Sequence, residues 1–293
     1  MNGPQISWLP DGKRLHMNHG PIDLIVEAFG QQDERRAAYA QAAARFATIL
    51  EELVAELPEL RRPSSRDVPR AFASRTARRM EAACRPFAES FVTPMAAVAG
   101  AVADEMLAAL VEGRRLERAY VNDGGDIAIH LASGQSMKLA IAGTGHGLSD
   151  RAEIGSASPV RGIATSGWRG RSHSLGIADA VTVLARNAAA ADVAATLIAN
   201  AVDLPGHAAI RRASARELAP DSDLGERLVT VAVGALTPTE VPRALQAGLA
   251  VAEDFSRRGL IEAAALFLGG ESRTCGRVAQ ALPETPREEL LHA

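Results

Sequence analysis

The chain has 293 residues, of which 47% are hydrophobic and 23% charged, and this composition is that of an ordinary globular protein with a sizeable core. Its net charge of −3 gives no support to a nucleic-acid partner, and the cysteines Cys84 and Cys275 form neither a metal-binding spacing nor a disulfide framework. The first residues lack the apolar segment of a secretory signal, and the apolar run 95–110 is interrupted by Asp104 and Glu105. These features predict a cytoplasmic protein that does not span a membrane.

The N-terminal part of the chain predicts a strand and two long helices. Residues 22–26 suit a strand, and from Asp33 to Pro58 apolar residues recur every three or four positions, as in a core-packing helix. A second helical stretch begins near residue 95 and ends at Gly113. Between the helices, residues 61–79 hold seven arginines. Such a run suits a phosphate or an acidic partner, but the flanking acidic residues favour a solvated surface.

Short strands and glycine-rich turns follow in the middle of the chain. Strands are expected at 118–121, 127–131 and 137–141, with residues 132–135 forming a hairpin turn between the last two. Residues 143–147 form a glycine-rich loop, which either holds a phosphate through backbone amides or is a plain connection.

The remaining elements alternate between strands and helices. An apolar strand at 181–184 leads into an alanine-rich helix, and residues 205–223 form an irregular polar connector. After a β-branched strand at 228–233, the capping signal at 237–240 starts another helix. Residues 260–268 form a last strand or a buried helix.

Strands packed by long helices predict an α+β fold with antiparallel or mixed sheets. Each half of the chain has strands, a long alanine-rich helix and a glycine break. We therefore expect one domain with two structural halves, at about residues 1–115 and 116–270, followed by a loose C-terminal tail at 271–293.

The first candidate site is the junction between two strands, where the sequence reads Asn122-Asp123-Gly124-Gly125-Asp126. The two glycines permit positive φ and allow a ligand to approach the backbone, and Asp126 can then accept hydrogen bonds from a ribose, a ring nitrogen or a main-chain amide. A tight turn capped by its aspartates explains the same residues equally well.

The second candidate site lies on the alanine-rich helix. Asp192 and Thr196 are four residues apart, so they share one helix face. A buried carboxylate among alanines needs a partner. That partner is either a hard divalent cation such as Mg²⁺ or, as the favoured alternative, an arginine or a helix N-terminus.

A third group of polar residues lies between these two sites. His173 stands near Arg169 and Arg171, whose charges favour a neutral imidazole that can act as a base, although a lone loop histidine is usually an exposed bystander. Thr165 and Ser166, which precede Gly167, have no base beside them in the sequence. They are better suited to hydrogen bonding than to nucleophilic attack.

Taken together and in order, these segments resemble the ApbE-like superfamily, the FAD:protein FMN transferases, and over the whole length the chain is similar to an uncharacterised branch of that superfamily. The motifs that carry the resemblance are Gly124-Gly125-Asp126, Ala164 to Gly167 with His173, Ala191-Asp192 with Thr196, and residues 97–104, which are similar to the family segment AKGxAxD.

The resemblance implies an α+β, ApbE-like (T-fold-like) fold with an internal pseudo-duplication and a cleft for a flavin dinucleotide. It implies that Mg²⁺ binds Asp192, Thr196 and a backbone carbonyl near Ala97. It also implies that Asp126 and Thr165, with Asn122, Gly124, Gly125, Ser166 and Gly167 around them, line the FAD site. The histidine of the motif, His173, would be the base beside Asp126. Divalent cations neutralise pyrophosphate charge and polarise the bond that breaks.

The chain departs from the family pattern at two positions. No Pro-x-Thr-Gly follows His173, and Ala99 stands where the family has lysine. Three functions follow as hypotheses: a Mg²⁺-dependent FMN transferase or FAD pyrophosphatase; a flavin- or metabolite-binding protein without turnover; or another enzyme whose acidic or heterocyclic substrate is recruited by Arg161, Arg169 and Arg171. The expected partners are a nucleotide or metabolite, a protein acceptor of FMN, and further copies of the chain.

Overall fold

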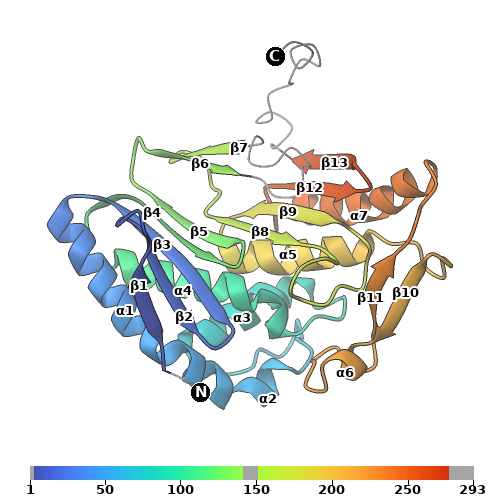
Figure 1. Ribbon diagram of the computed structural model, residues 1–293, viewed down its shortest axis with the longest axis horizontal. Helices are drawn as coiled ribbons and strands as arrows, with labels where there is room; N and C mark the ends of the chain where they lie inside the picture. The colour runs from blue at the N-terminus through green and yellow to red at the C-terminus, as the bar shows by residue number, and fades with distance from the viewer. Residues whose placement is uncertain (1–2, 141–150, 277–293) are drawn as a thin grey trace, which may run out of the picture.

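A nine-stranded sheet runs through the whole molecule. The computed structural model describes residues 3–140 and 151–276, and its strands follow the order β1-β2-β3-β4-β5-β8-β9-β12-β13, with each neighbouring pair antiparallel (Figure 1). The antiparallel sheet and its helices confirm the α+β fold. The strands of this sheet are β1 Gln5–Trp8, β2 Leu15–His19, β3 Ile22–Gly30, β4 Leu116–Asp123, β5 Asp126–Leu131, β8 Gly162–Ser166, β9 Ala180–Ala185, β12 Ala263–Leu268 and β13 Glu271–Gly276.

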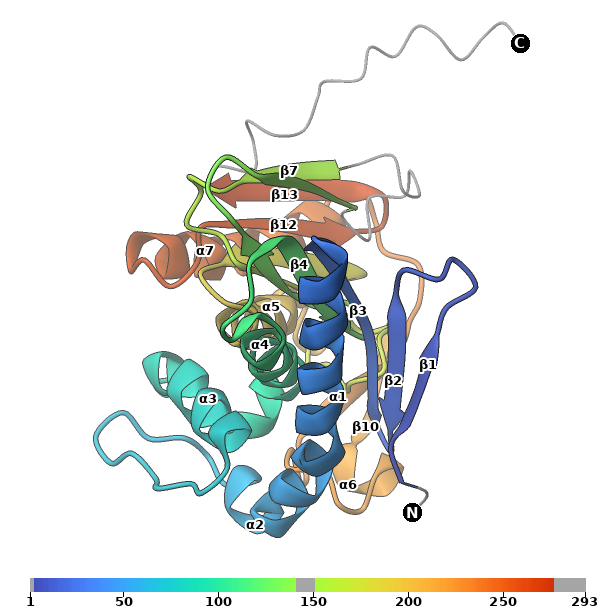
Figure 2. The ribbon, with the colours of Figure 1, turned by 90° about the vertical axis from the view of Figure 1, so that its left-hand side faces the viewer.

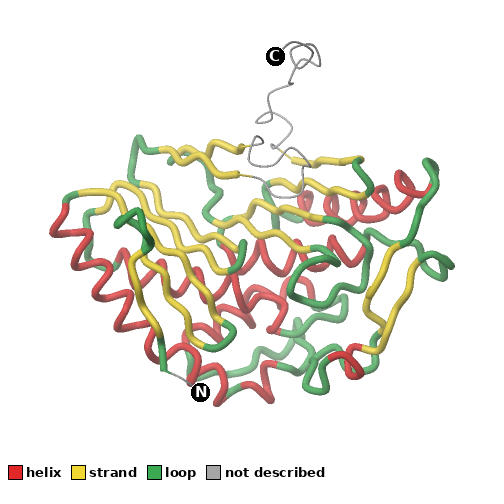
Figure 3. The backbone as a smooth tube through the Cα atoms, viewed as in Figure 1, coloured by secondary structure: helices red, strands yellow, loops and turns green. Residues whose placement is uncertain are grey.

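Helices cover one face of this sheet, as the turned view and the backbone trace both show (Figures 2 and 3). The main core is formed between the sheet and these helices, and it includes residues from Leu15 near the start of the chain to Leu268 near its end. The helices are α1 Gln32–Ala55, α2 Leu57–Leu60, α3 Arg75–Cys84, α4 Val98–Val111, α5 Ala188–Ala201, α6 Ala215–Leu218 and α7 Glu240–Arg257, with short 3₁₀ segments η1 Arg85–Phe87 and η2 Pro94–Ala97.

The helices α4 and α5 touch through their backbones. A Cβ atom on Gly100 would lie 2.3 Å from the carbonyl oxygen of Ala188, so only glycine fits there. Buried alanines on both helices have small side chains that allow a close approach along the rest of the contact. This small-residue contact fixes the start of each helix against the other.

The opposite face of the sheet is partly covered by a separate hairpin. Its strands, β6 Ser136–Ala140 and β7 Arg151–Gly155, pair with one another, and Met137 and Ile154 pack in a second apolar cluster with Ile129 and Ile163. The predicted hairpin between 127–131 and 137–141 is therefore wrong. Both edges of β5 are already occupied, by β4 and β8, so β6 cannot join it.

Two further expectations differ from the structure. The connector at 205–223 contains β10 Ile210–Ser214 and α6, and β10 pairs with β11 Leu228–Val233 in a separate two-stranded ribbon. Weak apolar alternation in β10 hid this strand, which is defined by its partner. The predicted loose tail begins with a strand, because β13 extends the sheet beside β12. The glycine-rich loop at 143–147 and the rest of the tail lie outside the described residues.

One helical stretch, Pro94–Val111, has the length and apolar composition of a membrane span, with a mean hydropathy of 1.5. Half of it is buried inside the protein, where α4 packs against α1, α5 and the strands β4 and β5. Core helices of globular proteins pass the same test of length and composition.

Replacing Gly100 with alanine tests the contact between α4 and α5. The added methyl would strike the Ala188 carbonyl, so we expect Gly100→Ala to lower the free energy of unfolding by about 2–4 kcal/mol. This is the opposite of the gain of about 1 kcal/mol that the same change gives in an open helix. Urea unfolding measures it. The control is Gly155→Ala, where the new methyl meets no atom within 4 Å, and equal stabilities of the two variants would contradict the prediction.

Candidate functional site

Two carboxylates face each other across the turn between β4 and β5. Asp123 and Asp126 are Cα partners in the strand register, and between them Gly124 and Gly125 have φ values of 61° and 117°. Positive φ at both central residues is the pattern of a type I′ hairpin turn. Asn122 completes the turn by accepting a hydrogen bond from the Gly125 amide at 2.8 Å. The predicted tight turn is thus present, but Asn122 closes it, and the two aspartates accept hydrogen bonds from residues outside the turn.

Both carboxylates lie on the helix-covered face of the sheet. Val121 and Ala128, two residues from Asp123 and Asp126 on their strands, belong to the main core, and side chains two apart share a face. Asp123 is 4% exposed and its closest hydrogen-bond donor, the Asp23 amide, is 3.5 Å away. Asp126 accepts a hydrogen bond from the Thr165 amide at 3.3 Å.

A third carboxylate, that of Asp192, projects from α5 toward the same place. Burial raises the pKa of Asp192 to about 7, and the charge of Asp123 contributes to the rise. Burial also raises the pKa of Asp126 well above its usual range, with further contributions from Asp192 and Asp123. Like charges in a poorly hydrated place disfavour ionisation of one another. We call Asp123, Asp126 and Asp192 the aspartate cluster.

The position of Asp192 follows from a reciprocal pair of helix caps. Its carboxylate accepts a hydrogen bond from the Gly100 amide at 3.0 Å, in the first turn of α4. Conversely, Asp104 on α4 accepts hydrogen bonds from the amides of Ala188 and Ala189, in the first turn of α5, at 3.0 and 2.9 Å. Each helix therefore supplies the acid that caps the other, and helix N-termini favour such negative groups. A helix N-terminus is the partner that the sequence favoured for Asp192.

The other two predicted metal ligands lie close to Asp192 along these helices. Ala97 ends η2 and is the N-cap of α4, three residues before Gly100. Thr196 follows Asp192 by one turn, and its hydroxyl has no hydrogen bond to any described residue. A carboxylate, a hydroxyl and a carbonyl are oxygen ligands that suit Mg²⁺. In the part of the chain that the structure describes, no group of three His, Cys, Asp or Glu residues is arranged to hold a metal, so the rest of a coordination shell would come from water or phosphate.

A loop at residues 167–179 runs from β8 to β9 beside the cluster. Asn200 on α5 accepts hydrogen bonds from the Leu175 amide at 2.8 Å and the Ser174 hydroxyl at 3.3 Å, and the Ser174 carbonyl accepts one from Thr230 on β11 at 2.8 Å. This loop carries His173, which is exposed and has no hydrogen bond to a described residue. The structure therefore holds the loop directly after the exposed histidine.

The remaining predicted nucleotide-site residues belong to β8 and to the start of this loop. The Thr165 hydroxyl pairs with that of Thr182 at 2.9 Å, so Thr165 reaches Asp126 through its backbone and not through its side chain. Ser166 ends β8 and is half-buried. Gly167 lies so close to the other end of the loop that a Cβ would be 2.4 Å from the Asp179 carbonyl oxygen.

Among the three arginines predicted to recruit a substrate, only one is left without a partner. The Arg161 guanidinium donates to the carbonyls of residues 156, 158 and 160. Arg169 pairs with Asp179 at 3.3 Å and stacks over Trp168. Arg171 makes no hydrogen bond or ion pair with the described residues and lies against Gly124. The hypothesis built on three arginines therefore reduces to Arg171.

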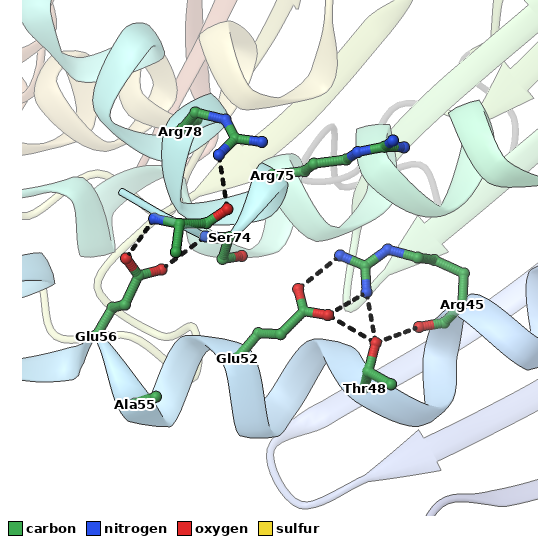
Figure 4. A pocket seen from close by; sticks show the side chains of 9 residues that line it. Arg45, Thr48, Glu52, Ala55, Glu56, Ser74, Arg75 and Arg78 are labelled. Atoms are coloured by element: carbon green, nitrogen blue, oxygen red, sulfur yellow. Dashed lines mark hydrogen bonds and ion pairs between the residues drawn. The ribbon is translucent and has the colours of Figure 1, made fainter. Parts of the chain in front are cut away.

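A cavity of about 640 Å³ lies elsewhere, between α1 and the start of α3 (Figure 4). Most of its charged groups are engaged within the protein: Arg45 pairs with Glu52 and Glu105, and Glu56 accepts hydrogen bonds from the amides of Ala73 and Ser74. Other arginines of residues 61–79 pair with glutamates. Acidic residues thus offset the arginines as the sequence favoured, but only some pairs are solvated, since the Arg70–Glu81 pair is largely buried.

Sequence reasoning assigned no role to two acids that organise the site. Asp104 caps α5, and Asp123 stands opposite Asp126. For Asp123 a signal was available, because residues that flank a two-residue hairpin turn are cross-strand partners on one face. Asp104 ends the motif segment 97–104, but nothing local predicts its capping role, since the helix that it caps begins far away in the sequence.

A family model described as AbpE bacteria matches residues 6–274. A UPF0280 protein of Methanopyrus kandleri is 39% identical over 164 residues, 54% of this chain and 63% of that protein. One of Methanothrix thermoacetophila is 41% identical over 113 residues, 38% of this chain and 46% of that protein. The matches thus span less than two thirds of these relatives.

Among solved structures, the ApbE protein of Thermotoga maritima superposes with a TM-score of 0.55 over 96% of this chain and 100% of that one. The sequences are 13% identical, so the likeness is one of fold.

The aspartate cluster predicts an unusual dependence of stability on pH. Burial raises the pKa of Asp123 to about 7, above the 3.8 of an exposed aspartate. The folded state therefore binds this proton more tightly than the unfolded state, and stability falls as pH rises from about 4 to 7. We expect Asp123→Asn, which cannot ionise, to be more stable than the wild type at pH 8 by about 1–3 kcal/mol. At pH 4, where the folded wild type keeps Asp123 protonated, we expect no such gain in stability. Urea unfolding at both pH values measures this. As a control, Asp221→Asn, at an exposed position, should leave the free energy of unfolding unchanged at both pH values. A variant Asp123→Asn that is less stable than the wild type at pH 8 would contradict the prediction.

Proposed function

This chain belongs to the AbpE bacteria family, and we propose that it binds a flavin dinucleotide, FAD, at the aspartate cluster together with Mg²⁺. The activity proposed is cleavage of the FAD pyrophosphate, with the FMN half passed either to a protein acceptor or to water. Family membership and the resemblance of the site motifs support the choice of FAD. The geometry of the aspartate cluster supports the choice of a cation-dependent site.

The observation that carries the proposal is an excess of negative charge in a buried place. Burial raises the pKa of Asp123, Asp126 and Asp192. The charges of Asp123 and Asp192 raise that of Asp126 further, and the charge of Asp123 raises that of Asp192. Among the described residues only Arg171 contributes a nearby positive charge to Asp123 and Asp126. A divalent cation would relieve this repulsion, and it would also allow a pyrophosphate to approach three carboxylates. Residues with strongly shifted pKa values cluster at functional sites in proteins.

The roles of the individual residues follow from their positions. Asp192, with the hydroxyl of Thr196 and the carbonyl of Ala97, would hold Mg²⁺, which when bound neutralises phosphate charge and favours departure of one phosphoryl group. Asp126, held by the Thr165 amide, would line the nucleotide site and orient the ligand by accepting hydrogen bonds from it. His173, on its fixed loop, would take the proton from the attacking hydroxyl of a threonine acceptor or of water.

Transfer and hydrolysis differ only in the acceptor of FMN. Transfer leaves FMN bonded to a protein and releases AMP, whereas hydrolysis releases FMN and AMP together. A mass gain on an acceptor protein therefore identifies a transferase, and free FMN identifies a pyrophosphatase.

Binding without turnover is the second candidate, and the state of His173 favours it. A general base is normally held by a second group that orients it, and the exposed His173 has no such partner among the described residues. Tight FAD binding with neither free FMN nor modified acceptor would identify this function.

Calorimetric titration with FAD, with and without Mg²⁺, tests the proposal. We expect Mg²⁺ to raise the affinity for FAD by about tenfold or more, because the cation offsets the charge of the carboxylates and the pyrophosphate. Asp192→Asn should abolish this effect, although its amide oxygen can still cap Gly100.

The matched control is Asp104→Asn, the same change in the reciprocal cap. It perturbs α5 in a comparable way and should retain the effect of Mg²⁺. Absence of FAD binding in either condition would refute the proposed function.

A further inference from the structure

The side chain of Arg171 rests on the bare backbone of the β4–β5 turn. A Cβ atom placed on Gly124 would lie 2.2 Å from Nη2 of Arg171 and 3.2 Å from its Cζ. The guanidinium therefore occupies the space that any other residue at position 124 would fill. Two constraints make Gly124 a glycine: its φ of 61° and the arginine beside it.

The guanidinium lies close to the aspartate cluster but forms no ion pair or hydrogen bond with it. Its positive charge lowers the pKa of both Asp123 and Asp126, so it lies within electrostatic reach of each. No ion pair within 4.0 Å or hydrogen bond joins it to any residue that the structure describes. A guanidinium has five N–H donors in a planar fork, and here they are open to a ligand.

The loop that carries Arg171 is fixed on both sides. At its start Gly167 is packed against Asp179, the residue just before β9, and Ser174 is bound by Asn200 and Thr230 further along. Contact with Gly124 adds a third support between these two. The guanidinium is therefore positioned before any ligand arrives, which lowers the entropy cost of binding through it.

We propose that Arg171 binds the phosphate groups of the ligand that the aspartate cluster takes, and that Gly124 lacks a side chain so that the arginine can be held there. The inference rests on the proposed function. A phosphate that binds beside three carboxylates needs nearby positive charge to offset the repulsion. A cation at Asp192 would supply part of that charge. The guanidinium of Arg171, whose planar fork binds two phosphate oxygens at once, would supply the rest. Arg171 thus selects ligands with a phosphate over those without.

Calorimetry with FAD and with riboflavin, which has no phosphate, tests the inference in the presence of Mg²⁺. We expect Arg171→Ala to weaken FAD binding about 10- to 100-fold, the range for losing one charged hydrogen-bonding partner, and to leave riboflavin binding unchanged. Arg171→Lys keeps the positive charge but loses the planar fork, so its affinity for FAD should lie between that of the wild type and that of Arg171→Ala. If Arg171 served only to balance charge within the fold, its removal would change stability without changing the preference for FAD over riboflavin.

A second variant tests the role of Gly124 without touching the arginine. The new methyl of Gly124→Ala would displace the guanidinium, so we expect the same loss of FAD affinity as in Arg171→Ala, and no further loss in the double variant. The matched control is Gly113→Ala, which has a similar φ of 66° but no atom within 4 Å of the new methyl, and which should bind FAD as the wild type does. Circular dichroism and urea unfolding establish that each variant is folded.

The outcomes separate this inference from the proposed function. If the wild type binds FAD and Arg171→Ala binds it equally well, Arg171 has no such role and the proposed function stands. If the wild type does not bind FAD, the proposed function fails, and inorganic pyrophosphate with Mg²⁺ becomes the probe. Loss of pyrophosphate binding in Arg171→Ala would then still support the inference, whereas equal binding, or none to the wild type, would overturn it.

Discussion

The contact between α4 and α5 is the constraint on which the candidate site depends. Gly100 brings the two helices together at their N-terminal ends, and the carboxylates of Asp104 and Asp192 each cap the opposite helix. Both helices pack on the sheet, α4 on β4 and β5 and α5 on β8 and β9. Fixing the helices to one another therefore also fixes Asp192 opposite the β4–β5 turn, which is flanked by Asp123 at the end of β4 and Asp126 at the start of β5.

Holding these carboxylates together is costly to the fold. Because burial raises the pKa of Asp123 to about 7, against 3.8 when exposed, its ionisation above that pH destabilises the folded protein by about 1–3 kcal/mol. Domains are commonly stable by only about 5–15 kcal/mol. Asparagine would suit the same hairpin without this cost, because Asn122 and the glycines already make the turn. The acid at position 123 is therefore explained by a ligand more readily than by the fold.

Local patterns in the sequence were enough to predict much of the fold and part of the site. Apolar spacing located α1, α4 and α5, and the Gly-Gly turn located the β4–β5 hairpin. Pairings between distant strands were not readable: β6 was expected beside β5, whose second edge is taken by β8. Likewise Asp104 and Arg171 contact residues far along the chain, Ala188 and Gly124, so these contacts could not be predicted from local patterns.

The β10–β11 ribbon, of which the sequence predicted only β11, holds the loop at the point where this chain differs from the family pattern. After His173 the family motif is absent, and a different set of contacts holds the loop: Asn200 from α5 and Thr230 from β11 bind Ser174. Because Ser174 is three residues from Arg171, these contacts hold the arginine near Gly124 as well as the histidine. A loop built in this way places one positive charge beside the aspartate cluster. Where the family motif is absent, contacts from α5 and β11 are therefore what position Arg171 in this chain.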